Sequence, residues 1–289
     1  MTKLIVSHST NPFYNLAIEE WAVRNIDTSE CDYLFLYVNT DCVVVGRNQN
    51  VFQEVNLKYC REHNIEITRR VSGGGTVFHD LENLNWTFIT KFDNAKVNNY
   101  AHFAEPIINV LKKIGLDAYL NKRNAIMVGE TKVSGQAQFT NRKNILSHGT
   151  LLIGSDTTKL QESINLKHKT VISRATPSVN SLVKNLKDLC AKGISIQDIQ
   201  NLLLKECEIS EVFKIDEEIQ KLILEIQETY KTQKWIYERS SKCTIEEEYQ
   251  NELLTFEIEN AKVVGIKNKK GEEINQHPFL NQLYFNLFV

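Results

Sequence analysis

The sequence predicts an α+β protein whose sheet is mixed or antiparallel. Several β-rich runs follow one another between residues 33 and 90, before a long helical pattern over 103–115. More β-rich runs continue to residue 154, the pattern then becomes mostly helical, and β-rich runs return after Trp235. Groups of strands followed by groups of helices are typical of α+β domains, whereas doubly wound folds alternate strictly between strand and helix.

Composition and charge exclude several functional classes. The chain has 289 residues, 42% of them hydrophobic and 24% charged, which suits one large domain with a small module. The formal net charge of -2 argues against a broad nucleic-acid surface, because such surfaces carry clustered basic residues. No apolar run approaches the ~18 residues of a membrane span, and no signal or transit peptide pattern is present, so we expect a cytoplasmic protein.

The cysteines are scattered and form neither a C-x-x-C pair nor a zinc-finger spacing with histidine. We interpret them as reduced thiols and expect no metal site built by the protein. They are Cys31, Cys42, Cys60, Cys190, Cys207 and Cys243.

The first elements in this prediction are a helix and a hairpin. Residues 15–26 repeat apolar side chains at helical spacing, with Asn15 as a candidate N-cap, and predict an amphipathic helix packed on a sheet. Two β-rich runs flank residues 39–41 and predict a hairpin whose second strand ends at Gly46.

A glycine-rich segment lies on a connection between two predicted strands. A short helix over residues 57–62 precedes a strand over 65–70, which delivers two arginines to three consecutive glycines. Strands over 76–80 and 84–90 follow directly.

A second group of strands follows the helix over residues 103–115. Strand-like segments at 124–129, 132–139 and 145–154 are separated by turn residues, and we expect them to form a second sheet facing the first.

The later helices are predicted over residues 178–186 and 195–207, and from Asp216 onward. The second has the capping-box-like spacing of Ser195 and Asp198 at its start. The third repeats apolar residues at helical spacing opposite a charged face, which is typical of a packing helix.

The character of the chain changes again at Trp235. Residues 253–271 predict a hairpin and 279–289 a final apolar helix. We place a domain boundary near Lys234, which gives a large domain over 1–234 and a short C-terminal module over 235–289.

The segment "TRRVSGGGTVFHD" carries the first chemical signal. Three consecutive glycines lose backbone entropy and pack no side chain, so a compact domain that keeps them is using bare backbone. Converging amides hold an anion and arginines add charge-assisted contacts, so phosphate or carboxylate is the expected ligand. The segment matches neither the P-loop nor the dinucleotide-binding pattern.

Two later segments place a lysine and a histidine beside small residues. Lys132 stands two residues before Ser134 and Gly135, and His148-Gly149 interrupts an apolar strand. Taken alone, each is more often a solvated or structural residue. Their conjunction with the glycine-rich segment, in this order, is informative.

These segments, together with "NPFYNLAIEEW" and "VVVGRNQNVFQEVN", resemble the lipoate-protein ligase A family, within the wider group of lipoyl and octanoyl transferases and biotin ligases. The resemblance runs from about Asn11 to the end of the helical segment. It implies the biotin/lipoate ligase fold: a large catalytic domain of mixed or antiparallel sheets flanked by helices, plus a small, abbreviated C-terminal α+β accessory domain.

The resemblance implies a two-step ligase reaction. Lipoate and ATP with Mg²⁺ give enzyme-bound lipoyl-AMP and pyrophosphate, and a lysine of an acceptor then takes the lipoyl group as an amide. The implied acceptors are lipoyl domains of 2-oxoacid dehydrogenase acyltransferases or the glycine-cleavage carrier protein. Lipoic acid salvage is the implied physiological setting.

The resemblance also implies roles for individual residues. Lys132 matches the lysine that bridges the lipoyl carbonyl and the phosphate, as an electrostatic clamp and not a nucleophile. The expected nucleotide-binding positions are Arg70, Gly75, Thr76, Val77 and Phe78. Residues expected to shape the turn between acyl chain and phosphate are Ser72, Gly73 and Gly74. Residues expected to line or orient the site are His79, Ser134, Gly135, His148 and Gly149.

Apolar strand residues beside these motifs have two interpretations. They suit an apolar lipoyl tail, yet we interpret them as core: Val43, Val44, Val45, Leu151 and Leu152.

The chain departs from the family pattern in three places. Ala125 stands where the family often has an aspartate, which would weaken activation if that aspartate holds the adenylate or its metal. Glu82 replaces a turn glycine and is expected to add negative charge near an anion site. The C-terminal module is short, and in the family this module moves between activation and transfer.

Two alternative functions remain open from the sequence. One is a lipoyl or octanoyl transferase that uses a pre-activated or protein-bound acyl group without adenylation, with Cys190 as the candidate for a cysteine acyl intermediate. The other is a non-catalytic carrier of lipoate or lipoyl-AMP. Lipoate and octanoate are both compatible with these motifs.

Overall fold

The structure is a computed structural model that describes residues 1–164, 170–179 and 181–287. The helices are α1 (Pro12–Asn25), α2 (Val51–Glu54), α3 (Leu57–Glu62), α4 (Tyr100–Lys113), α5 (Thr157–Ile164), α6 (Ile196–Glu206), α7 (Glu217–Lys231) and α8 (Gln233–Ile236). The strands are β1 (Thr2–Ile5), β2 (Asp32–Tyr37), β3 (Cys42–Val45), β4 (Glu66–Arg69), β5 (Val77–His79), β6 (Asn83–Lys91), β7 (Ala118–Leu120), β8 (Ile126–Val128), β9 (Thr131–Ser134), β10 (Gln136–Thr140), β11 (Asn144–Leu152), β12 (Val171–Ser173), β13 (Ile209–Phe213), β14 (Cys243–Tyr249), β15 (Glu252–Glu259) and β16 (Lys262–Lys267). Within the described ranges, no helix combines the length and apolar character that a bilayer crossing requires.

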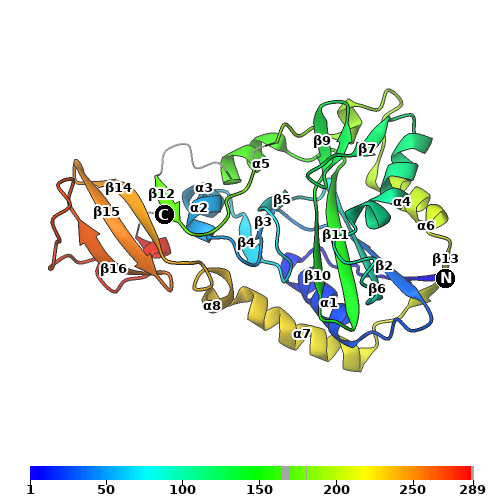
Figure 1. Ribbon diagram of the computed structural model, residues 1–289, viewed down its shortest axis with the longest axis horizontal. Helices are drawn as coiled ribbons and strands as arrows, with labels where there is room; N and C mark the ends of the chain where they lie inside the picture. Colours follow the sequence, from blue (N-terminus) through cyan, green and yellow to red (C-terminus); the bar gives the residue numbers. More distant parts are fainter. Residues whose placement is uncertain (165–169, 180, 288–289) are drawn as a thin grey trace.

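The largest sheet has six strands in the order β10-β11-β6-β2-β1-β13 (Figure 1). β1 runs parallel to β2 and β13, and the other neighbours are antiparallel. The predicted α+β class with a mixed sheet is confirmed.

The expected second sheet facing the first is wrong. β11 pairs along its whole length with β6, from Asn144 opposite Lys91 to Leu152 opposite Asn83, so β10 and β11 extend the first sheet. Two long strands of matched length bury more backbone hydrogen bonds in one sheet than two separate sheets would. Only β8 and β9 lie elsewhere, in a small sheet with β7.

Side chains of β2 alternate between two helical layers. Leu34 and Leu36 join the core under α4 and α6, whereas Tyr33, Phe35 and Tyr37 join the core under α1 and α7. This period of two places the six-stranded sheet between two pairs of helices. α1 is buried on most sides, because α7 covers the face that points away from the sheet.

The start of α1 differs from the prediction. Asn11 is the N-cap, its side chain accepts hydrogen bonds from the amides of Phe13 and Tyr14, and Pro12 occupies the first turn. Asn15 lies inside the helix, fully buried, and its side chain contacts Asn39 instead.

The hairpin predicted around residues 39–41 does not form. β2 lies between β1 and β6, so both of its edges are already hydrogen-bonded. β3 passes into a separate sheet, parallel to β4 and antiparallel to β5. The glycine-rich segment connects β4 to β5, as the sequence predicts.

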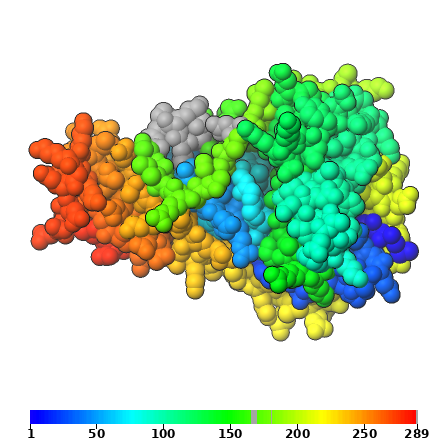
Figure 2. All heavy atoms as spheres, viewed as in Figure 1, coloured from blue at the N-terminus to red at the C-terminus, as the bar shows by residue number. Residues whose placement is uncertain are grey.

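The C-terminal residues form a lobe at one end of the molecule (Figure 2). Its sheet has the order β12-β14-β15-β16, and the β15–β16 hairpin predicted over residues 253–271 is present. Asn260 and Ala261 at its turn have φ values of 49° and 62°, as a type I′ turn requires. β12 comes from residues 171–173, so the sheet combines segments from both sides of the boundary near Lys234, which stays a prediction.

Two predicted helices are absent among the described residues. Of residues 178–186, residue 180 lies outside the described residues. The Leu182 carbonyl accepts from the Lys132 amide and the Lys184 amide donates to the Lys132 carbonyl, so residues 182–184 pair with β9 as an extended stretch. In residues 279–287, the described part of the other predicted helix, only a 3-10 turn at Tyr284–Asn286 forms, because the preceding backbone bonds to β16. Residues 288–289 lie outside the described residues. The helices predicted over 195–207, with its capping box, and from Asp216 are confirmed.

Candidate active site

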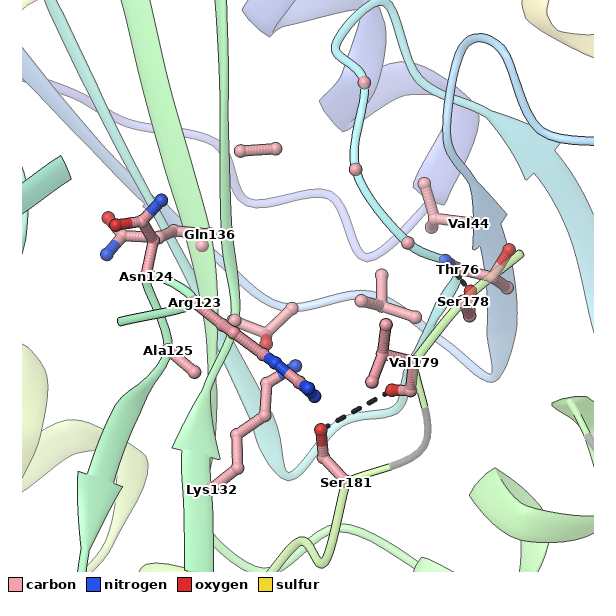
Figure 3. Close-up of a pocket in the computed structure, with 18 of the residues that line it drawn as sticks. Val44, Thr76, Arg123, Asn124, Ala125, Lys132, Gln136, Ser178, Val179 and Ser181 are labelled. Atoms are coloured by element: carbon pink, nitrogen blue, oxygen red, sulfur yellow. Dashed lines mark hydrogen bonds between the residues drawn. The ribbon is translucent and has the colours of Figure 1, made fainter. Parts of the chain in front are cut away.

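A cavity of about 750 Å³ lies between the glycine-rich loop, the β7-β8-β9 sheet and residues 176–179 and 181–182 (Figure 3). Of the residues that the sequence singles out, those lining it are Lys132, Arg70, Gly73, Gly74, Gly75, Thr76, Val77, His79, Gly135, His148 and Gly149. Ser72, Phe78 and Ser134 are buried behind its wall. The tertiary fold therefore brings the three separate motifs to one place.

The glycine-rich loop is held by the turn that follows β3. The Arg47 amide donates to the Ser72 carbonyl over 2.8 Å. A methyl group added at Gly46 would overlap the carbonyl oxygen of Gly74, so the two backbones are in direct contact. Gly74 has a φ of +86°, a conformation that disfavours any side chain. Glycine is thus required at both positions by geometry.

Arg70 is fixed by the loop that it supports. Its guanidinium donates to the carbonyls of Gly73 and Gly75 over 2.7 Å and to the Val44 carbonyl over 3.0 Å. Burial lowers the pKa of Arg70 to about 10. Most of its donors are therefore committed to shaping the loop, and its expected contact with nucleotide stays a prediction.

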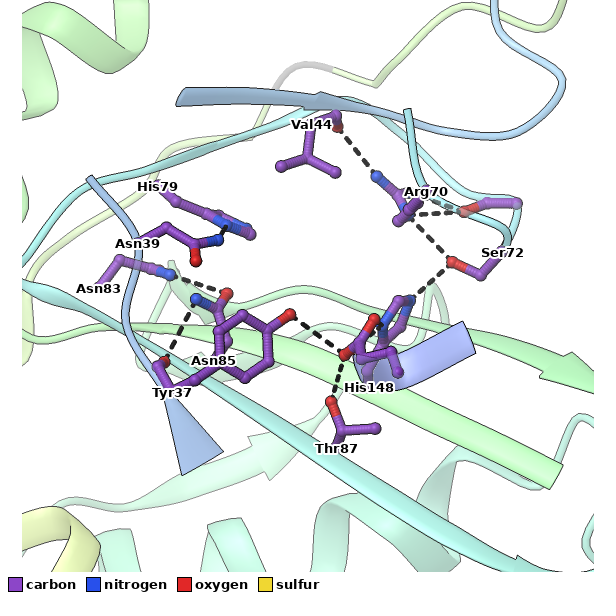
Figure 4. A network of polar contacts seen from close by, with 12 residues as sticks. Tyr37, Asn39, Val44, Arg70, Ser72, His79, Asn83, Asn85, Thr87 and His148 are labelled. Atoms are coloured by element: carbon purple, nitrogen blue, oxygen red, sulfur yellow. Dashed lines mark hydrogen bonds and ion pairs between the residues drawn. The ribbon is translucent and has the colours of Figure 1, made fainter. Parts of the chain in front are cut away.

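A buried relay connects α1 to this loop (Figure 4). The Glu19 carboxylate, 1% exposed, accepts from His148 Nδ1 over 2.9 Å and from the Thr87 and Tyr37 hydroxyls. On its other side, His148 Nε2 lies 2.6 Å from Ser72 Oγ, which accepts from Arg70 Nε over 3.0 Å. The relay is satisfied when His148 carries its proton on Nδ1 and accepts the Ser72 hydroxyl on Nε2.

Lys132 presents its ammonium to the cavity from β9. Its Nζ lies 2.9 Å from the position a Gly135 side chain would occupy, so glycine leaves room for the lysine. Burial, and secondarily the Arg70 charge, lowers the pKa of Lys132. Among the described residues no carboxylate pairs with it, which is the arrangement expected of a cation that waits for an anionic ligand.

Residues 176–179 and 181–182 line one side of the cavity and were not predicted as part of the site. Ser178 Oγ accepts from the Thr76 amide and from Gln49 Nε2, both over 2.9 Å, and donates to Glu54. The Thr76 amide is one of the loop donors expected to hold phosphate. No sequence pattern predicts the contact between Ser178 and the Thr76 amide, because the two residues are distant along the chain.

Polar residues of the β7–β8 connection were also missed. Arg123 points into the same space as Lys132, and Asn121 and Asn124 line the cavity nearby (Figure 3). Gln136 lines it as well, and neither of its buried amide atoms has a hydrogen-bond partner in the part of the chain that the structure describes. The polar run "NKRN" at residues 121–124 was the only sequence feature that pointed to these residues, but polar turns of this kind are common.

Residues 11–208 match the family model described as the lipoyl protein ligase A/B catalytic domain. That range contains the glycine-rich loop, Lys132 and His148. This chain belongs to that family.

Individual relatives agree with the family assignment. Lipoate--protein ligase 1 of Staphylococcus aureus is 35% identical over 266 residues, which cover 89% of this chain and 81% of the relative. The solved structure of lipoate-protein ligase A bound with ATP is 26% identical, with a TM-score of 0.70, over 81% of this chain and 97% of that one. P. falciparum LipL1, solved in complex with lipoate, is 25% identical, with a TM-score of 0.69, over 91% of this chain and 83% of that one.

The departures from the ligase family pattern have different structural consequences. Ala125 does line the cavity. The expectation that Glu82 adds charge near the anion site is wrong, because its carboxylate pairs with Lys187 over 2.7 Å and lies outside the cavity lining. Cys190 is likewise outside the lining, beside the Gly193 carbonyl.

The apolar strand residues divide between core and site. Val43 and Val45 pack in one core cluster and Leu151 in another, while Leu152 is buried, as the core interpretation predicts. Val44 lies between them with the opposite orientation and lines the cavity.

Proposed function

We propose that this chain is an ATP-dependent lipoate-protein ligase that activates lipoate to lipoyl-AMP and transfers the lipoyl group to a lysine of an acceptor protein. The observation that carries the proposal is the partly buried ammonium of Lys132, which no carboxylate of the described residues pairs with, in a cavity of about 750 Å³ beside the glycine-rich loop. Membership of the ligase family supports the same reaction.

In the first step, a lipoate carboxylate oxygen attacks the α-phosphorus of ATP. A P–O bond forms, the bond to the bridging oxygen breaks, and pyrophosphate leaves. Two anions must approach each other, so a fixed cation lowers the barrier where charge accumulates. Lys132 presents a partly buried positive charge to the cavity, and the exposed Arg123 adds a second cation to its lining.

In the second step, the neutral amine of an acceptor lysine attacks the lipoyl carbonyl carbon. An amide bond forms, the bond to the AMP oxygen breaks, and the amine loses a proton. Lys132 stabilises the carbonyl oxygen as it gains negative charge. The proposed acceptors are lipoyl domains of 2-oxoacid dehydrogenase acyltransferases or the glycine-cleavage carrier protein.

The cavity offers little to hold a metal ion by itself. Among the described residues no group of three or more His, Cys, Asp or Glu side chains is placed to bind one, and Glu130 is the only acidic side chain of the lining. We propose that Mg²⁺ arrives with ATP and is held mainly by phosphate oxygens and water, as is common for this ion.

The transferase alternative has less support. A cysteine acyl intermediate needs a thiol in the site, and no cysteine of the described residues lines the cavity. The carrier alternative predicts binding without turnover, and observation of more than one turnover per chain excludes it.

The test is lipoate-dependent exchange of labelled pyrophosphate into ATP by the purified chain without acceptor. We expect exchange that requires lipoate and that disappears in Lys132→Ala. Absence of exchange, together with acyl transfer from synthetic lipoyl-AMP to a lipoyl domain, would instead identify a transferase that depends on another activating enzyme.

A further inference from the structure

A chain of buried side-chain amides ends at His79. The Asn15 amide nitrogen donates to the carbonyls of Ser9 and Val38 and to Asn39 Oδ1, the last over 2.8 Å. The Asn39 oxygen is thereby the acceptor, so its nitrogen is the group that lies 3.0 Å from His79 Nδ1. Asn15 and Asn39 are both fully buried, which leaves neither amide free to rotate in solvent.

This geometry fixes the tautomer of His79. An amide nitrogen is a donor only, so His79 Nδ1 must accept and the ring proton must reside on Nε2. Burial, with smaller contributions from Arg70 and His148, lowers the pKa of His79 to about 3, so the ring stays neutral. His79 therefore presents a donor, and not an acceptor, on Nε2.

The Nε2–H group of His79 has no hydrogen-bond partner among the described residues. The imidazole is 4% exposed and lines the cavity, and it points toward the space between Val44 and Asn85 (Figure 4). Tyr37, which lines the same region, already donates its hydroxyl to Glu19. A buried donor without an acceptor is costly, so a ligand atom is expected to complete it.

The cavity has an open end and a buried end. Arg123 and Ser181 line it at exposed positions near Lys132 (Figure 3). By contrast, the lining residues that lie around His79 in Figure 4 are buried, namely Tyr37, Val44 and Asn85. A ligand whose carboxyl group meets Lys132 would place the far end of its acyl chain in this buried region.

We propose that the Nε2–H of His79 recognises the distal end of the acyl chain, favouring the dithiolane sulfur of lipoate over the terminal methyl of octanoate. This inference rests on the proposed function and assigns it a specificity-determining residue. Sulfur is a weak hydrogen-bond acceptor and a methyl group is none, so octanoate leaves the donor unpaired.

The expected discrimination is about threefold to tenfold in kcat/KM, the range of one neutral hydrogen bond gained or left unmade. It should be constant from about pH 6 to pH 8, because the ring does not titrate there.

The decisive variant is Asn39→Asp, which leaves His79 in place. A carboxylate only accepts, so it draws the ring proton to Nδ1 and turns Nε2 into an acceptor. We expect the lipoate-to-octanoate ratio of kcat/KM to fall to near one. Asn144→Asp is the matched control, because Asn144 is an equally buried amide outside the cavity lining, and its substitution should preserve the ratio.

A spectroscopic measurement on the wild-type chain tests the same inference if Asn39→Asp does not fold. Long-range ¹H–¹⁵N spectra of the wild-type chain, with the His79 signal assigned by its loss in His79→Gln, should show the Nε2–H tautomer. Saturating lipoate should shift that ¹⁵N signal, and octanoate should shift it less.

The outcomes separate this inference from the proposed function. An unchanged ratio in Asn39→Asp, an Nδ1–H tautomer in the wild type, or equal shifts with both acids would overturn the role of His79 while leaving the ligase assignment intact. Absence of turnover with either acid would instead remove the proposed function, and the ligand-induced ¹⁵N shifts would still decide whether His79 contacts the tail.

Discussion

At the scale of single residues, the site uses buried polar groups whose partners are set by the fold. Lys132 is a partly buried cation with no carboxylate partner among the described residues, while Glu19 is a buried carboxylate with three donors. Burying a charge is costly unless it is paired. Lys132 is therefore expected to lower stability in favour of function, and the paired Glu19 is expected to contribute to stability.

Lys132→Met tests the cation directly. The pKa of Lys132 is lower in the folded than in the unfolded chain, so below its folded pKa the charge costs stability. The variant should lose at least ~100-fold in ligation rate yet unfold at an equal or higher temperature. Lys143→Met, at an exposed position, should leave both quantities unchanged. An active variant, or one that is inactive because it has unfolded, would contradict the assignment.

Glu19→Gln tests the relay that ends at the glycine-rich loop. A glutamine turns one acceptor into a donor that faces Tyr37, Thr87 and His148, so we expect a loss of about 1 to 3 kcal/mol in the free energy of unfolding. Urea denaturation measures it. As a control, Glu228→Gln breaks an exposed ion pair with Lys231 and should change stability by less than about 0.5 kcal/mol. Equal losses in the two variants would mean that the hydrogen bonds of Glu19 do not contribute to the free energy of unfolding.

At the scale of elements, the glycine-rich loop depends on the turn after β3 as much as on its own sequence. Gly46 touches the Gly74 carbonyl, whereas a methyl group at Gly73 would meet open space. These two glycines therefore have different physical reasons to be glycine.

Gly46→Ala should displace the loop and cost about 1 to 3 kcal/mol, the usual effect of overpacking. Gly73→Ala is the matched comparison in the same loop and should keep the wild-type melting temperature. Differential scanning calorimetry of both variants checks this. If both melt alike, the close contact between the two backbones does not exist in solution.

Arg69 shows how elements of the two ends of the chain are joined. Its buried guanidinium donates to the carbonyls of Gly46 and Gln49 on one side and of Ile236 on the other, at 2.9, 2.7 and 2.7 Å. From the sequence, Arg69 and Arg70 were equivalent candidates for the site. In the structure, Arg69 binds the connection to the C-terminal lobe, whereas Arg70 lines the cavity.

At the scale of the whole molecule, the C-terminal lobe shares a core with the catalytic part. Val43 and Phe52 pack in one cluster with Phe256 and Tyr284, and β12 pairs with β14. The physical unit is therefore larger than the composition change at Trp235 suggests.

Truncation after Lys234 should expose this cluster and destabilise the remaining chain. We expect residues 1–234 to melt at a lower temperature than the full chain and to bind a hydrophobic dye. The matched control is the full chain cleaved at a protease site inserted after Ser241, which keeps both pieces and should melt near the wild-type temperature. A stable 1–234 fragment would support two independently folding domains.

Local patterns predicted much of this fold correctly. The capping box at Ser195, the helix from Asp216 and the hairpin within residues 253–271 depend on neighbouring residues alone. The hairpin at 39–41 and the helix at 178–186 failed because distant strands compete for the same backbone groups. The site was predicted only as a set of separate motifs.

By itself, the sequence determined the α+β class and the family, and it singled out Lys132 as the candidate cation, because these follow from short-range pattern and residue type. Only the tertiary structure decided that Ser178 caps a loop amide, that Arg70 shapes the loop, and that Asn39 fixes the tautomer of His79. Hydrogen-bond direction between residues far apart in the chain depends on how the sheets pack, and no local pattern encodes it.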